Sequence, residues 1–305
     1  MHFFLILFPI FCIFIVGFIG QKTLRFDISA LSKMALYVLS PFLSFKTFYS
    51  HELTISYLYY VFYVLLLCVI LASIVTLWAY LMKYNLKERC ALVLASCFMN
   101  NGNYGTPVIL VFFGAIGFDV AVILMVLQQF IMSTIGVYFA AKGSEYSISQ
   151  KEVFKRVFRM PIAYGALLGI MFQLLHIPLS DQIMLAVSMI GDSSIPVIML
   201  ILGMQLATLH IRQVEIAKVS FALLIRMVVS PLVALVLVYF MPIDYMSKQV
   251  LIVLAAMPSA ANTTLLSVQF NTKPEMVSSA TFLSTLISLI TLPIVLWLVD
   301  PPIVF

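Results

Sequence analysis

Three asparagines, two glycines and a proline interrupt an otherwise apolar stretch in the first half of the chain. They form the segment Asn100-Asn101-Gly102-Asn103-Tyr104-Gly105-Thr106-Pro107. Proline removes a backbone N–H donor and disfavours helix at the residue before it, and glycine permits the unusual dihedrals that follow. We therefore predict an unwound segment here, with a simple kinked helix as the alternative.

A second interruption follows in the other half of the chain, with the sequence Pro258-Ser259-Ala260-Ala261-Asn262-Thr263-Thr264. If both helices break, two half-helix N-termini point into the protein with partial positive charge and free N–H donors. Such ends suit a carboxylate or another anion. A proline kink lined by small residues for close helix contact is the alternative.

These two interruptions define the candidate site. The residues predicted to bind substrate are Asn100, Asn101, Asn103, Ser259, Asn262 and Thr263. Those predicted to hold the helices open are Gly102, Gly105, Pro107 and Pro258. Free backbone groups cannot face lipid, so each break is expected to line a cavity or to lie within the protein.

The elements that carry these residues belong in a membrane. Hydrophobic residues make up 63% of the 305 residues and charged residues only 10%, whereas a soluble domain has about 25% charged residues. A span needs about 20 mostly apolar residues. Ten segments meet that rule: 3–20, 31–49, 55–82, 90–116, 119–141, 161–177, 183–207, 219–241, 250–270 and 276–299.

Basic residues set the expected orientation. Of the 17 lysines and arginines, fourteen fall on the side of the odd-numbered connectors and two on the opposite side. Cytoplasmic loops carry the excess of such residues, so both termini are predicted to lie on the extracytoplasmic side. Residues 142–160 form a basic cytoplasmic loop between residues 1–141 and 161–305. Five spans on each side make the two halves an inverted repeat, an architecture typical of secondary transporters.

Two ionisable residues lie inside predicted spans, Asp192 in the seventh and Arg226 in the eighth. Such residues are costly in a membrane and usually functional. Asp192 is a candidate to carry a coupling proton or help bind a cation; the alternative is a hydrogen-bonded structural aspartate. Arg226 is a candidate partner for Asp192 or for an anionic substrate; the alternatives are structural pairing and snorkelling to the cytoplasmic interface.

Other classes of protein have little support in the sequence. The basic residues lie between apolar runs and so indicate topology, not nucleic-acid binding. The four cysteines form no CxxC pair, and no His/Cys cluster has metal-ligand spacing. Paired aspartates, a Ser/His arrangement and a HExxH motif are absent at usable spacing, so we expect no enzyme, no metal and no cofactor.

The first interruption resembles the Asn-x-Gly-x-x-Gly-x-Pro signature of the auxin efflux carrier family, and the segment 257–263 is similar to that family's second signature. A looser pattern in the seventh span, Pro196 with Leu200, Gly203 and Leu206, also resembles the family. The likeness covers essentially the whole chain. The short central loop is more similar to bacterial members, which include malonate and other organic-acid permeases, than to the plant auxin exporters.

The resemblance implies an all-α fold in which the fourth and ninth of ten helices cross at the midplane, with elevator-type alternating access. Asn100 and Pro107 match the first crossover, and Pro258 and Asn262 match the second. Asn101 and Asn103 stand where small or apolar residues are common in the family. The expected function is transport of a small organic anion across the bacterial inner membrane, with proton coupling, sodium coupling or none. The alternative is a sodium-coupled symporter of the bile-acid type; a homodimer is one candidate assembly.

Overall fold

The computed structural model describes residues 2–51, 54–144, 161–208 and 215–299. Over these residues the chain is helical, and its one extended contact is an isolated bridge between Met99 and Ser259. Most of the predicted basic loop, residues 145–160, lies outside the described residues. The structure therefore confirms an all-α membrane-type protein for the part of the chain that it describes.

Among the described residues, six helical stretches are long and apolar enough to cross a membrane: Ile28–Ser50, Ile55–Leu81, Asn101–Lys142, Asp181–Thr208, Ile216–Tyr239 and Pro274–Val299. Shorter apolar helices cover Phe8–Leu24, Pro161–Leu174 and Tyr245–Ala255. The stretch Asn101–Lys142 leaves helical geometry at Gly114, with φ 69° and ψ −163°, near the boundary expected between the fourth and fifth spans. The ten-helix arrangement itself remains a prediction.

The chain divides into two compact units. Unit 1 contains Met1–Leu58, Gly102–Val126 and Arg159–Thr208, and unit 2 contains Tyr59–Asn101, Leu127–Phe158 and Leu209–Phe305. Each unit therefore combines segments from both halves of the sequence. The segment Gly102–Val126 belongs to unit 1, so the chain passes from unit 2 to unit 1 between Asn101 and Gly102.

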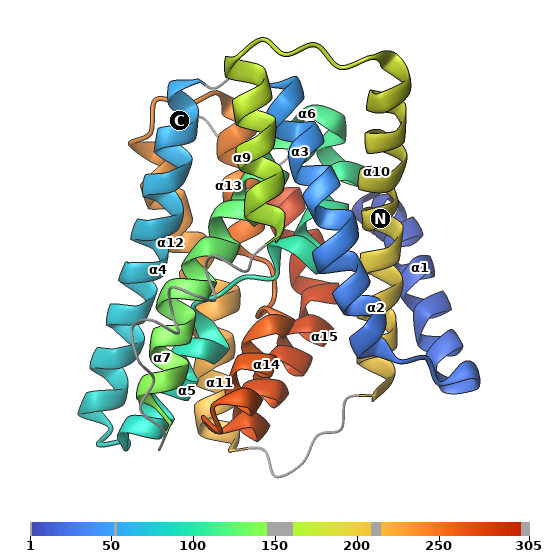
Figure 1. The fold of residues 1–305 in the computed structure, drawn as a ribbon. Helices are drawn as coiled ribbons and strands as arrows, with labels where there is room; N and C mark the ends of the chain where they lie inside the picture. The colour runs from blue at the N-terminus through green and yellow to red at the C-terminus, as the bar shows by residue number, and fades with distance from the viewer. Residues whose placement is uncertain (1, 52–53, 145–160, 209–214, 300–305) are drawn as a thin grey trace. The chain divides into compact units, whose positions relative to one another are not determined.

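Unit 1 is a group of closely packed helices. Its helices include α1 (His2–Leu24), α2 (Ile28–Met34), η1 (Ala35–Leu39), α3 (Ser40–Ser50), α9 (Pro161–Leu174) and α10 (Asp181–Thr208). Helix α10 packs on α1 and on α3, and α3 packs on α9 (Figure 1).

Glycines allow these helices to approach at backbone distance. A Cβ atom at Gly17 would lie 2.2 Å from the carbonyl oxygen of Leu200, and one at Gly203 would lie 2.0 Å from that of Phe14. Gly165 is equally close to the main chain of α3. Small residues at helix interfaces are the usual means of close packing in membranes, where no hydrophobic effect drives helices together.

Unit 2 is built around two short, buried helices. Its elements are α4 (Ile55–Leu81), α5 (Leu86–Ser96), η3 (Met132–Gly136), α7 (Val137–Lys142), α11 (Ile216–Leu224), η4 (Ile225–Val229), α12 (Ser230–Tyr239), α13 (Tyr245–Ala255), α14 (Ala261–Gln269) and α15 (Pro274–Val299). Helix α15 packs on α5, α11, α13 and α14, while α4 is tied to α13 by a hydrogen bond from Tyr63 Oη to Leu251 O of 2.8 Å. Nearly every residue of α5 and α13 past the first turn is buried, as expected for helices that are apolar all round.

An ionic cluster joins three helix starts in unit 2. Lys218 Nζ lies 2.6 Å from Glu88 Oε1 and also contacts Glu215, and Lys273 Nζ lies 3.0 Å from Glu215 Oε1. Burial acts to raise the pKa of Glu88, but hydrogen bonds from Lys218 and the Asn85 N–H leave that pKa below its ordinary value. Hydrogen bonds from Lys218 and Lys273 likewise lower the pKa of Glu215 against its partial burial. Both carboxylates are therefore held ionised.

Candidate functional site

The first interruption begins where α5 ends, at Ser96. Residues 97–100 are not helical, and the π-helical turn η2 (Asn101–Gly105) and then α6 (Thr106–Ile131) follow. Pro107 is the second residue of α6, which continues directly from η2. The break thus precedes the glycines: Gly102 and Gly105 lie in the π turn, not in the extended segment.

The second interruption has the same form. Helix α13 ends at Ala255, residues 256–260 are not helical, and α14 begins at Ala261. Pro258 lies in the extended part, as the sequence predicts. Each interruption therefore separates one buried half-helix from the helix that follows it.

The two interruptions pair with each other inside unit 2. The Asn100 N–H donates to Pro258 O at 2.9 Å, and the Ala260 N–H donates to Phe98 O at 2.9 Å. These bonds flank the antiparallel bridge between Met99 and Ser259. Because lipid offers no partner to a free backbone group, each break supplies the partners that the other needs.

Two of the predicted substrate-binding side chains have structural partners around this pairing. Ser259 is 1% exposed; its Oγ donates to Ala95 O in α5, and its N–H donates to Ser284 Oγ in α15 at 3.1 Å. Thr263 Oγ donates to Ala260 O at 2.8 Å, at the start of α14. These hydroxyls are engaged in the protein, so their primary contribution is to fix the geometry of the breaks.

The asparagines are placed differently. Asn101 is 1% exposed, and among the described residues neither its Oδ1 nor its Nδ2 has a hydrogen-bond partner. Asn100 is also buried, whereas Asn262 is half-buried in the first turn of α14. Asn103 is half-buried in η2 and belongs to unit 1. The Asn101 amide is therefore a buried polar group with unused hydrogen-bonding capacity.

Gln128 is a residue that sequence reasoning left out of the predicted site. It is 3% exposed, and its Nε2 has no hydrogen-bond partner among the described residues. It lies four residues before Met132, where the π-helical turn η3 begins. A Cβ at Gly136 in that turn would lie 3.4 Å from the ring of Phe98, so η3 meets the first interruption. Gln129 follows directly, so the sequence does not show which of the two glutamines is buried.

Arg226 and Asp192 do not pair with each other; each has its own partners. Asp192 is paired with Lys46, whose Nζ lies 2.7 Å from Oδ2, within unit 1. Arg226 is completely buried in unit 2, so snorkelling to the interface is wrong for this residue. It hydrogen-bonds to main-chain carbonyls, which agrees with the structural-pairing alternative. A further pair in unit 1 joins His51 Nε2 to Asp119 Oδ2 at 3.0 Å.

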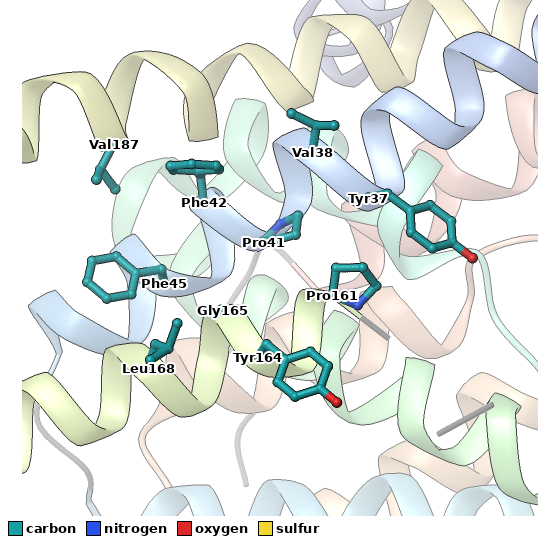
Figure 2. A pocket seen from close by; sticks show the side chains of 10 residues that line it. All are labelled: Tyr37, Val38, Pro41, Phe42, Phe45, Pro161, Tyr164, Gly165, Leu168 and Val187. Carbon is teal, nitrogen blue, oxygen red and sulfur yellow. The ribbon is translucent and has the colours of Figure 1, made fainter. Parts of the chain in front are cut away.

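An apolar groove in unit 1 does not contain the predicted site. It has a volume of about 450 Å³ and is lined by Tyr37, Val38, Pro41, Phe42, Phe45, Pro161, Tyr164, Gly165, Leu168 and Val187. Figure 2 shows that aliphatic and aromatic side chains surround it, with the tyrosine hydroxyls as the polar side-chain atoms drawn. Apart from the hydroxyls of Tyr37 and Tyr164, this lining offers no side-chain donor to an anion. Within the described ranges, no three His, Cys, Asp or Glu side chains are grouped so as to hold a metal ion.

Apolar spans and paired helix interruptions of this kind define a membrane transport protein. The family model described as "Membrane transport protein" matches residues 2–296, and the chain belongs to this family, that of the auxin efflux carriers. An uncharacterized transporter of Methanothermobacter thermautotrophicus is 27% identical over 286 residues, 92% of this chain and 90% of that protein. One from Methanocaldococcus jannaschii is 26% identical over 245 residues, 77% of each. The chain is therefore a multi-pass membrane protein of a transporter family, as the motifs indicated.

Proposed function

We propose that this protein is a secondary transporter that moves a small organic anion, a carboxylate, across the membrane by elevator-type alternating access. It performs no chemical conversion of the solute. The observation that carries the proposal is the antiparallel pairing of the two interruptions around Met99 and Ser259. That pairing brings buried amide groups and the start of α14 to one place within unit 2.

The chemistry of this place favours an anion. The N-terminus of α14 has partial positive charge and donors without intrahelical partners. Its cap residue, Ala260, provides no side chain to satisfy those donors. Asn262 in the first turn and the Asn101 amide add neutral hydrogen bonds, which bind a carboxylate without burying a second full charge. Asn100 completes the proposed set within unit 2, while Ser259 and Thr263 hold the second break in position.

The composition of the two units supports an elevator motion. Unit 1 takes residues 1–58 and 102–126 from the first half and 159–208 from the second, and unit 2 takes the rest of both halves. The ranges 1–58 and 159–208 stand at equivalent places in the proposed inverted repeat of residues 1–141 and 161–305, joined by the loop 142–160, whereas 102–126 has no counterpart from the second half in unit 1. In the proposed cycle the paired residues 98–100 and 258–260 and the substrate move together as part of unit 2. Such folds bind substrate near the midplane at broken helices.

We place the protein in a bacterial inner membrane with both termini on the extracytoplasmic side. The basic residues at the starts of α5, α11 and α15, which include Lys87, Arg89, Lys218 and Lys273, then face the cytoplasm. This orientation follows the charge asymmetry of membrane loops. Tagging each terminus and testing its accessibility in sealed cells tests the assignment.

A ligand screen tests the proposed function directly. The purified protein in detergent is heated with a panel of mono- and dicarboxylates, inorganic anions and neutral analogues, and hits are then tested as labelled solutes in proteoliposomes. We expect at least one carboxylate to raise the melting temperature and to be transported. Its neutral amide should have no effect, because the amide lacks the negative charge that the helix end attracts.

Variants locate the site. Asn100→Ala combined with Asn262→Ala should abolish the ligand-dependent shift. Gln128→Ala should weaken it, whereas Gln129→Ala, at the adjacent and more exposed position, should leave it unchanged. A carboxylate response that survives the double asparagine change would place the binding site elsewhere.

A further inference from the structure

The two buried half-helices of unit 2, α5 and α13, both end beside the side chain of Arg226. Arg226, in η4, is 0% exposed. Its Nη1 lies 3.4 Å from the carbonyl oxygen of Ser96, the last residue of α5, and its Nη2 donates to that of Ala255, the last residue of α13. A single guanidinium group therefore joins the C-terminal ends of both half-helices.

A neighbouring hydroxyl fixes this arrangement. Arg226 Nη2 also contacts Ser230 Oγ, which in turn donates to Ala255 O at 2.8 Å. The Ser230 side chain is itself fully buried, at the first residue of α12. The planar guanidinium presents several donors in a fixed fork, so it can serve two carbonyls and a hydroxyl at once.

The charge of Arg226 is balanced by the helix ends. Among the described residues, Arg226 makes no ion pair with a carboxylate, while other buried or half-buried cations such as Lys46 and Lys218 do. Each helix C-terminus carries a partial charge of about −0.5, so the two ends together match one positive charge. The two C-terminal ends thus offset the guanidinium charge locally, without an acidic side chain.

In transporters with broken helices, the C-terminal carbonyls of half-helices are the groups that coordinate a coupling cation such as sodium. We propose that Arg226 is a built-in cation at this position: its guanidinium occupies the carbonyl ends of α5 and α13, so transport needs no sodium ion there. This inference deepens the proposed function: the role of Arg226 in transport rests on the proposal that the protein is a transporter. Because an arginine is always charged and cannot dissociate, the N-terminal ends across the interruptions keep their attraction for an anion in every step of the cycle.

Sodium binding to the purified protein tests the inference without any organic substrate. Equilibrium binding of ²²Na⁺ is measured alongside melting curves in sodium, potassium and choline chloride at equal ionic strength. The wild-type protein and Arg226→Lys, which keeps the charge, should show no saturable sodium binding and the same melting temperature in all three salts. Arg226→Gln, which removes the charge but keeps an amide donor, should gain saturable binding of about one ion per chain and a sodium-specific rise in melting temperature.

Two further variants complete the design. Ser230→Ala keeps the cation while removing the adjacent hydroxyl, so it should stay insensitive to sodium; a gain there equal to that of Arg226→Gln would overturn the assignment. Arg226→Ala replaces Arg226→Gln if the latter does not fold. Saturable sodium binding by the wild-type protein, or a folded neutral variant that binds none, would contradict the proposal. The result is independent of the carboxylate screen, so failure of one can be told from failure of the other.

Discussion

Replacing Asn101 by leucine should stabilise the ligand-free protein and abolish its response to ligand. Asn101 is 1% exposed, and neither side-chain polar atom has a hydrogen-bond partner among the described residues. A buried polar group without a hydrogen bond costs about 1–3 kcal/mol. Leucine has nearly the same shape and needs no partner, so the substitution removes that cost.

The expected size follows from the two unsatisfied atoms. Together they set an upper limit of roughly 2–6 kcal/mol, and local relaxation relieves part of it, so we expect a gain of about 1–2 kcal/mol in the free energy of unfolding. For a chain of this size each kcal/mol corresponds to about 2–4 °C in melting temperature. The assay is thermal unfolding of the purified protein followed by intrinsic fluorescence, with and without each carboxylate of the screen.

Asn85 provides the matched control. Its Oδ1 accepts a hydrogen bond from the Glu88 N–H at 2.9 Å, and it caps α5 in the same unit. Asn85→Leu should therefore destabilise the protein by about 1 kcal/mol. A lower melting temperature for Asn101→Leu than for wild type, or a retained carboxylate shift, would refute the reasoning that Asn101 holds an open hydrogen-bonding group for the solute.

Two further predictions concern the frame around the site. Gly17→Ala should lower the free energy of unfolding by about 1–3 kcal/mol, because the added methyl would lie 2.2 Å from a main-chain oxygen of α10; Gly20→Ala, whose nearest neighbour would lie 3.6 Å away, should be neutral or stabilising in the same thermal assay. The lowered pKa values of Glu88 and Glu215 mean that their contribution to stability is present at neutral pH and is lost as the pH falls through the folded-state values, below the ordinary range near 4.3. Lys218→Met should reduce the fall in melting temperature as the pH is lowered. An unchanged fall would show that the ion pairs do not cause it.

Local backbone chemistry was readable from the sequence. Pro258 lies in an extended break, and the segment from Asn100 to Pro107 contains the transition between two helices. The second predicted span also lies within the apolar stretch Ile28–Ser50, despite its two lysines. These successes share a cause: proline, glycine and hydrophobic run length act through nearest neighbours in the chain.

Contacts between distant segments were not readable in the same way. Nothing in the spacing of the residues pairs Lys46 with Asp192 or places Arg226 at the ends of two half-helices. Hydropathy suggested snorkelling for Arg226 because a charged residue near a span end usually reaches water. The partners of Arg226 are main-chain carbonyls at helix C-termini, and these groups have no residue type that marks them in the sequence. They can be identified only when the ends of α5 and α13 are known.

Disulfide trapping of the two interruptions tests the central claim most directly. Met99 and Ser259 stand opposite each other in an antiparallel bridge, where Cα atoms are separated by about 4.5–5.5 Å, within reach of a disulfide. Met99→Cys and Ser259→Cys are introduced into a chain lacking its native cysteines, with a protease site inserted in the loop 142–160. After mild oxidation in native membranes and cleavage, the two halves should stay joined until reductant is added, whereas Met99→Cys with Leu265→Cys should separate. Halves that separate freely in the first variant would contradict the pairing on which the proposed anion site depends.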